Sequence, residues 1–390
     1  MSDISVYFNV AKEIFRSVPD EEKISLGHFT EFHDEKGFPG LDGKQIAIFG
    51  VMEERGNPDN EGCSNGAEVI RKHLYGLRCG NFKPSFADLG NILPGSTIDD
   101  TYFAVREVMH ELMRRQIMPV LIGGSNDLAF ANYLAYTNIE PTINIVSCDS
   151  NFDLGRPEDP MSAASWVGKV ILHQPNHLFN FSNVGYQSYF VDETSLNLMS
   201  KLFFDAHRLG QLRPDMEEVE PILRNADMFA FDITSVKSSD APGHAFPNPN
   251  GFYGEEACRI ARYAGMNDKL TSAGFYEYNP RYDQREQTAK LLSQVIWYFL
   301  EGYYSRKKDF PFKNTSDYQK YHVGIKGHES EIIFYKSLKS DRWWMEVPYP
   351  PDKRLRVQRH CLVPCSYADY EVALTEEVPD RWWQTFQKLG

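Results

Sequence analysis

The sequence predicts an α/β protein with a mainly parallel central sheet covered by helices on both faces, followed by a small β-rich extension. Between Lys44 and Tyr304, short apolar runs alternate with amphipathic segments, which is typical of parallel strands joined by helices. After Tyr304, apolar and polar residues alternate one by one, as in half-buried antiparallel strands. We therefore expect an N-terminal lead-in (1–43), an α/β domain (44–304) and a Trp-rich C-terminal extension (305–390) packed on or near that domain.

Length and composition limit the class of protein. A chain of 390 residues is long enough for a large α/β domain with an appendage. Its hydrophobic fraction of 42% and charged fraction of 24% are ordinary for a globular protein. The formal charge of -13, without a block of Lys and Arg, argues against a nucleic-acid partner. Small molecules and proteins are the expected partners.

The sequence also predicts the compartment. The N-terminus lacks a basic start followed by an apolar core, and no apolar run has the length of a membrane span. The six cysteines are scattered along the chain, which fits reduced thiols. We expect a cytoplasmic protein without membrane insertion.

The elements of the α/β domain follow in order. Each predicted strand is a short apolar run that ends in turn-forming residues, and each predicted helix has apolar residues three and four positions apart. Asn65 is a plausible cap for the first helix. The predicted strands are 44–51, 86–91, 118–124, 142–147, 182–187, 227–234 and 272–279, and the predicted helices are 67–77, 101–116, 127–136, 196–212, 254–265 and 285–304.

The extension contains two predicted antiparallel strand regions, 322–338 and 341–348. Arg-Trp-Trp occurs at 342–344 and again at 381–383, so four of the six Trp lie here. These Trp either anchor the extension onto the main domain or form a partner-binding surface, because Trp and Arg favour interface hot spots. His360, Cys361 and Cys365 lie close in sequence, but they lack a second pair at zinc spacing and are interpreted as packed core residues.

Polar motifs follow four of the predicted strands. They are GGSND (123–127), DSNFD (149–153), FDITSVKSSDAPG (231–243) and EYNP (277–280). The carboxyl ends of parallel strands meet at one edge of the sheet, where such folds keep their sites. We therefore expect a site at this edge with DSNFD at its centre.

The order of these motifs resembles the ureohydrolase family of arginases, agmatinases and formimidoylglutamases. The family pattern is Gly-Gly-x-His, Asp-x-His-x-Asp, Asp-x-Asp with Ala-Pro-Gly, and Glu-x-Asn-Pro. NGAEVIR (65–71) and DLGN (88–91) are similar to two earlier family stretches, and GGSNDLAFANYL is most similar to the formimidoylglutamase version. The resemblance covers roughly 44–302 and implies a three-layer α/β/α arginase-like fold.

The resemblance also implies a set of metal ligands, because ureohydrolases hold two manganese ions whose bridging hydroxide attacks the substrate. Both family His positions hold Asn here, and the second Asp of Asp-x-Asp is Thr234. Asn and Thr are neutral and weaker ligands for manganese. We expect the second site to be empty and the first to accept at most one divalent cation, manganese or magnesium. When the family's ligand positions are transferred to this sequence, the ligands of the first ion are Asn126, Asp149, Asp153 and Asp232. The ligands of the second ion are Asn151, Asp149, Asp232 and Thr234.

Other polar residues have two readings each. Glu277 matches the family carboxylate that meets the substrate's cationic nitrogen, but it also suits a cap or a core ion pair. His173, His177 and His244 could replace a lost nitrogen ligand or act as a base, or they could be ordinary hydrogen-bonded histidines. Without an ion the three aspartates repel one another, and Lys237 is a candidate partner for them.

One further motif imitates the family. Asp205-Ala206-His207 spells the metal triplet, but the helical spacing of apolar residues over 196–212 predicts a helix there. We interpret the match as coincidence.

These changes lead us to expect a member of the arginase/formimidoylglutamase family that has lost the binuclear manganese site. Such a pseudoenzyme would bind a ligand or a protein, with Asp149, Asp232 and Glu277 as vestigial catalytic residues. The alternative is an active formimidoylglutamase-like hydrolase of C–N bonds in linear amidines that uses one ion or replacement ligands. A third reading is a structural subunit of a larger assembly. The resemblance also allows a homo-oligomer.

Overall fold

The computed structural model describes residues 3–10, 24–311, 315–325, 331–350 and 358–389. Its main feature is a ten-stranded sheet with the order β1-β4-β3-β5-β10-β9-β6-β7-β8, in which β2 also pairs with β4. Every pair is parallel except β1 with β4, which confirms the mainly parallel sheet. The strands are β1 Phe8–Asn9, β2 Thr30–Phe32, β3 Ile46–Val51, β4 Phe86–Ile92, β5 Met118–Gly123, β6 Ile143–Cys148, β7 Leu178–Tyr186, β8 Asp205–Arg208, β9 Met228–Asp232 and β10 Ser272–Tyr276.

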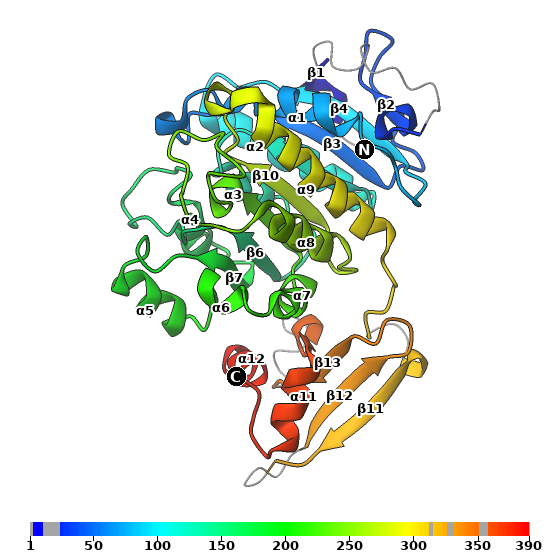
Figure 1. The fold of residues 1–390 in the computed structure, drawn as a ribbon, viewed down its shortest axis with the longest axis vertical. Helices are drawn as coiled ribbons and strands as arrows, with labels where there is room; N and C mark the ends of the chain where they lie inside the picture. The colour runs from blue at the N-terminus through cyan, green and yellow to red at the C-terminus, as the bar shows by residue number, and fades with distance from the viewer. Residues whose placement is uncertain (1–2, 11–23, 312–314, 326–330, 351–357, 390) are drawn as a thin grey trace.

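Helices cover both faces of this sheet (Figure 1). Successive residues of β3 enter different cores: Ile46 and Ile48 pack with one set of helices, and Ala47 and Phe49 with the other. Because both faces are buried, central strands such as β3 and β5 are entirely apolar. The chain thus has the predicted three-layer α/β/α fold. The helices are α1 Gly66–Leu74, α2 Ile98–Arg114, α3 Leu128–Leu134, α4 Trp166–Leu172, α5 Glu193–Lys201, α6 Leu209–Leu212, α7 Val219–Arg224, α8 Gly254–Gly265 and α9 Gln287–Tyr304.

The prediction of one helix over 196–212 is wrong. The chain there forms the end of α5, then strand β8 and the short helix α6. Phe203 adopts a left-handed backbone (φ 55°), which ends the helical path. The carboxylate of Asp205 then accepts hydrogen bonds from the Asn180 side chain and the Ser182 hydroxyl, and these polar contacts accompany the pairing of β8 with β7. A four-residue edge strand is too short to show a period-two pattern.

The extension forms a second, antiparallel sheet in the order β11-β12-β13-β14, as predicted, and its described residues also include two helices. It packs at the amino ends of strands β6, β7 and β9. Arg359 donates to the carboxylate of Asp227, just before β9, at 2.6 Å, and the ring of His360 stacks on Phe179 in β7 with centroids 3.9 Å apart. Figure 1 shows this unit beneath the larger one. Its elements are β11 Tyr318–Val323, β12 Ile332–Ser337, β13 Trp343–Glu346, β14 Leu362–Cys365, α11 Tyr367–Leu374 and α12 Asp380–Leu389.

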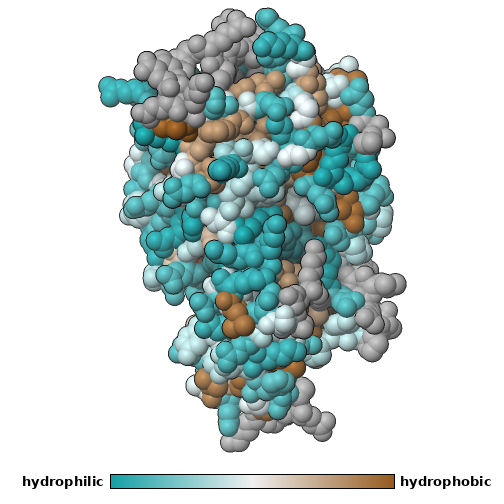
Figure 2. Space-filling model, turned by 90° about the vertical axis from the view of Figure 1, so that its right-hand side faces the viewer, coloured by the Kyte–Doolittle hydropathy of each residue, from teal (hydrophilic) through white to brown (hydrophobic). Residues whose placement is uncertain are grey.

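The Trp side chains of the extension differ in exposure. Trp343, Trp344 and Trp382 are buried, whereas Trp383 is 47% exposed. Trp343 and Trp382 pack in the core of the extension itself, and the ring of Trp344 contacts the guanidinium of Arg224 in α7. Hydrophilic residues cover most of the molecular face in Figure 2, with hydrophobic residues in separate patches. Within the described residues, we find no helix with the length and apolar character needed to span a bilayer.

Candidate functional site

The predicted site residues do follow neighbouring strands. Asn126 comes shortly after β5, Glu277 directly after β10, Asp232 ends β9 and Asp149 directly follows β6. These four strands are adjacent in the sheet, so their carboxyl ends bring the side chains together. All four residues are buried. The site lies at the opposite end of these strands from the C-terminal unit.

The amide of Asn126 connects two of the carboxylates. Its Nδ2 donates to Asp153 Oδ2 at 3.1 Å and to Asp149 Oδ2 at 3.4 Å. Its Oδ1 is buried and has no hydrogen-bond partner among the described residues. Asp153 also accepts a hydrogen bond from Trp166 Nε1 at 3.1 Å and has a left-handed backbone (φ 49°). The amide thus faces the carboxylates with a donor rather than with its oxygen.

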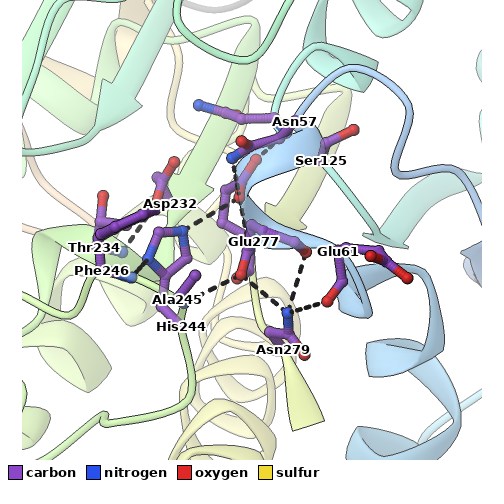
Figure 3. A network of polar contacts seen from close by, with 12 residues as sticks. Asn57, Glu61, Ser125, Asp232, Thr234, His244, Ala245, Phe246, Glu277 and Asn279 are labelled. Carbon is purple, nitrogen blue, oxygen red and sulfur yellow. Dashed lines mark hydrogen bonds and ion pairs between the residues drawn. The ribbon is translucent and has the colours of Figure 1, made fainter. Parts of the chain in front are cut away.

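The carboxylate of Glu277 is the centre of a hydrogen-bond network (Figure 3). Oε1 accepts from the Asn126 backbone N–H at 2.8 Å, and Oε2 accepts from the side-chain amides of Asn57 and Asn60, both at 2.8 Å. His244 Nε2 lies 3.3 Å from the same Oε2. Three of these four neighbours therefore lie at Oε2, whereas Oε1 accepts a single hydrogen bond and has room for a second.

The tautomer of His244 follows from its second ring nitrogen. The backbone N–H of Phe246 donates to His244 Nδ1 at 3.0 Å, so Nδ1 is an acceptor. The ring proton is therefore on Nε2 and points toward Glu277. Figure 3 shows the ring between Glu277 and the pair Asp232 and Thr234.

The remaining predicted ligands, Asn151 and Thr234, use their backbones to bind the aspartates. The Thr234 N–H donates to Asp232 Oδ1 at 2.7 Å, and the Asn151 N–H donates to Asp149 Oδ1 at 3.0 Å. The Thr234 hydroxyl lies 3.5 Å from the Ser150 hydroxyl. Among the described residues, no hydrogen bond joins the Asn151 side chain to another predicted ligand. Both oxygens of Asp149 and one oxygen of Asp232 thus already accept hydrogen bonds from the chain.

Burial and mutual repulsion shift the acidity of the cluster. Burial and the charges of Asp153 and Asp232 raise the pKa of Asp149 well above its usual range. Burial raises the pKa of Asp153 to about 6 and that of Asp232 to about 7. These shifts favour protonated carboxyls or a bound cation in the cluster.

Lys237 does not supply that cation. Its ammonium lies 3.6 Å from Asp240 and 3.9 Å from the centre of the Tyr253 ring. The prediction that it pairs with the aspartates is wrong, because the chain after β9 turns this side chain toward α8.

Of the three candidate histidines, the structure brings only His244 into the site. His173 and His177 hydrogen-bond through Nδ1 to the carbonyls of Pro175 and Pro141. Sequence reasoning missed Asn57 and Asn60, which lie in the long turn-rich loop after β3, and it missed Trp166. This loop separates the predicted strand 44–51 from the predicted helix 67–77, and no pattern in it indicated which of its residues reach Glu277.

The site has the chemistry of an oxygen-lined cation site. Carboxylates and amide oxygens suit hard cations, and buried carboxylates also suit a cationic organic group. Within the described part of the chain, no group of three or more His, Cys, Asp or Glu side chains is arranged as a metal site.

Comparison with known proteins places this geometry in context. The model of the arginase family matches residues 44–301. The formimidoylglutamase of Staphylococcus haemolyticus is 24% identical over 273 residues, which cover 65% of this chain and 85% of that protein. A Staphylococcus aureus formimidoylglutamase is 26% identical over 271 residues, which cover 66% of this chain and 86% of that protein.

Solved structures with the same fold include two from this group of enzymes. Trypanosoma cruzi formiminoglutamase with Mn²⁺ has a TM-score of 0.63 at 20% identity, covering 69% of this chain and 97% of that one. Formimidoylglutamase from Bacillus subtilis has a TM-score of 0.67 at 19% identity, and the match covers 76% of this chain and 96% of that one.

Proposed function

The chain belongs to the arginase family, and we propose that it is a formimidoylglutamase-like member that has lost binuclear manganese hydrolysis and instead binds a ligand or a protein. The observation behind this proposal is the amide of Asn126. Its Nδ2 donates to Asp149 and Asp153 and so binds the carboxylate oxygens that would face the first ion. In this orientation the amide offers the carboxylates a donor, and Asn at this position has no imidazole nitrogen to offer a manganese ion.

The donor set fits one divalent cation better than two. The manganese in the Trypanosoma cruzi structure supports a divalent cation in this family. Asp149, Asp153 and Asp232, with Asn126 Oδ1, are an oxygen set that would hold one hard cation if the Asn126 amide turned over. The second set does not fit, because it adds only neutral Asn151 and Thr234 to two shared aspartates. When bound, a single ion would supply positive charge to the cluster, and the chain's own part is to position these oxygens.

Glu277 supports loss of the family's activity as well. Three neighbours crowd Oε2 of the carboxylate that the resemblance assigns to the substrate's cationic nitrogen, and one neighbour lies at Oε1. A cationic substrate group that approaches Oε2 would have to displace a buried donor such as His244. Displacing a satisfied buried hydrogen bond reduces the affinity for the newcomer.

One observation favours the alternative of an active hydrolase. His244 brings an imidazole into the site, which could replace a lost histidine. Its hydrogen bonds oppose this role, because Nδ1 already accepts from Phe246 and the Nε2 proton points toward Glu277. A lone pair for a metal or a substrate proton would become free only if the ring turned. We therefore retain this function as the second candidate.

Metal content tests the proposal. The chain is loaded with Mn²⁺, passed over a desalting column and analysed by plasma mass spectrometry. We expect at most about one ion per chain. The variant Asn126→His/Asn151→His/Thr234→Asp should hold about two ions, because it restores imidazole and carboxylate ligands. Two ions in the unchanged chain would contradict the proposal.

Turnover separates the two candidates. The loaded chain is incubated with N-formimino and guanidino compounds, and release of formamide, ammonia or urea is measured. We expect no release above that of Asp149→Ala. Manganese-dependent release that Asp149→Ala abolishes would favour the hydrolase. In either case we propose a small-molecule or protein partner rather than a nucleic acid, since the net charge is -13.

A further inference from the structure

Two sequence motifs that the candidate site does not use meet at the other end of the molecule. The Asp205-Ala206-His207 segment forms β8, and His360 precedes β14 of the C-terminal unit. Both line a cavity of about 50 Å³ between the amino ends of β7 and β8, α7 and the C-terminal unit. Arg381 and Lys388 of α12 line it from the opposite side.

His360 supplies an unsatisfied polar atom to this cavity. The residue is 3% exposed, its ring stacks on Phe179, and its Nε2 lies 3.0 Å from the Thr142 hydroxyl. Its Nδ1 is buried and has no hydrogen-bond partner within the described residues. Leaving such an atom unpaired costs about 1–3 kcal/mol, so a buried nitrogen beside a cavity indicates a site for a polar group.

The charged side chains of the cavity already have partners. Lys388 Nζ donates to Asn180 Oδ1 at 2.6 Å and lies 3.6 Å from Asp205 Oδ1. Arg381 pairs with Glu218 and Asp369, both at 2.7 Å. The cavity therefore offers a polar group the unpaired Nδ1 of His360 and the ammonium of Lys388, whose contact with Asp205 is the longest of these ion pairs.

A second pocket of about 530 Å³, here called the groove, adjoins the cavity, because Phe179 and Lys388 line both. Leu178 and the segment Leu202–Phe204 supply its apolar walls. Lys201 is its other charged residue, and the lining includes no acidic side chain. The left-handed backbone of Phe203 leaves its ring 41% exposed at the groove.

We propose that the cavity and groove together bind an amphiphilic carboxylate, with the head group beside His360 and Lys388 and the apolar tail along Phe203. A cavity of this size has room for about three or four water-sized atoms, which suits a carboxylate. The groove lies within the roughly 300–1,000 Å³ of small-molecule pockets. The site is separate from the strand-end aspartates, so it does not depend on the proposed function.

Equilibrium dialysis of the full chain against labelled dodecanoate, below its micelle concentration, tests this proposal. We expect saturable binding of about one molecule per chain. Dodecylamine should bind at least about tenfold more weakly because its head-group charge is reversed, and acetate should bind far more weakly because it has no tail. Equal binding of dodecylamine, or no saturable binding because the groove serves an acidic protein instead, would overturn the proposal.

Variants separate the two halves of the site. Phe203→Gly keeps the left-handed backbone and removes the aromatic wall, and it should weaken dodecanoate binding about tenfold. Phe190→Gly is the matched control, since Phe190 is 42% exposed and lines neither the cavity nor the groove. His360→Phe keeps a ring on Phe179 but removes both nitrogens, and it should also weaken binding about tenfold.

Thermal unfolding of each variant accompanies these measurements. Weaker binding at an unchanged unfolding temperature supports the proposal. If His360→Phe does not fold, the exposed pair Phe203→Gly and Lys201→Glu still tests the groove. Unchanged binding in that pair would overturn the proposal.

Discussion

At the scale of single residues, the candidate site is defined by which atoms already have partners. The sequence predicted that Asn126, Asp149, Asp232 and Glu277 converge, because each follows a parallel strand. It could not predict that Glu277 accepts from Asn57 and Asn60, since those residues lie in an irregular loop more than two hundred positions away. Side-chain contacts of that kind depend on the path of the loop rather than on any period in the sequence.

The pKa of Asp232 gives a prediction about stability and pH. Its carboxyl has a pKa of about 7 in the folded chain against an ordinary value of 3.8, so the folded state binds more protons than the unfolded state between these pH values. The free energy of unfolding should therefore fall as pH rises from about 4 to 7 and change little above that. Asp232→Asn removes this titrating carboxyl, so the variant should lose less stability between pH 5 and pH 8 than the unchanged chain. The difference in the free energy of unfolding should be on the order of a few kcal/mol.

Urea unfolding in EDTA at pH 5 and pH 8 measures this difference. Asn keeps an oxygen that can accept from the Thr234 N–H. The exposed substitution Asp42→Asn is the control and should leave the pH dependence as it is. An Asp232→Asn variant with the same loss of stability at pH 8 as the unchanged chain would contradict the assignment of the raised pKa to Asp232.

At the scale of elements, long apolar strands and amphipathic helices were predictable and short edge elements were not. α8 has the predicted bounds of 254–265, because its apolar stripe packs against α9. The second Arg-Trp-Trp lies in α12, which the alternation of the extension did not indicate. β8 was missed because its four residues pair through polar contacts at the sheet edge.

Two early stretches of the sequence are joined by one buried ion pair. Arg71 of α1 donates to both oxygens of Asp88 in β4, at 2.7 and 3.0 Å, and its other donors reach Asn91 and the Gly90 carbonyl. Arg71→Leu leaves the Asp88 carboxylate buried without its cation, so the free energy of unfolding should fall by about 3–5 kcal/mol. Chemical denaturation measures this change.

A second substitution tests the physical reason. Asp88→Asn in the Arg71→Leu background removes the unpaired charge and should recover part of the stability. The matched control is Lys72→Leu, whose exposed pair with Glu286 should contribute less than about 1 kcal/mol. If Arg71→Leu costs no more than Lys72→Leu, then the buried pair does not fix α1 on β4.

At the scale of the whole molecule, the candidate site and the C-terminal unit lie at opposite ends of the central strands. The predicted boundaries at residues 43 and 304 are the points where the alternation of apolar runs and amphipathic segments begins and ends in the sequence. The described lead-in strands β1 and β2 pair with β4 of the main sheet, and α9 ends at Tyr304. The described residues of the C-terminal unit therefore supply no side chain to the strand-end site, and we propose that the unit provides a second binding surface of its own.

Arg224 tests how firmly that unit is attached. This buried side chain of α7 donates to the carbonyls of Trp343 and Cys365, at 2.8 and 3.0 Å, and its guanidinium lies 4.3 Å from the centre of the Trp344 ring. Arg224→Met removes both charge-assisted hydrogen bonds and the cation–π contact, and it leaves two buried carbonyls without that donor. We expect the free energy of unfolding to fall by about 3 kcal/mol.

Hydrogen exchange locates the effect within the molecule. If the unit is held on the main domain through Arg224, amides of β13 and β14 should lose protection in Arg224→Met, while those of β3 and β5 change little. Arg106→Met, at a partly exposed ion pair on α2, is the control and should leave both sets unchanged. Equal protection of β13 and β14 in the two variants would mean that the remaining contacts, such as Arg359 with Asp227, are sufficient to hold the unit in place.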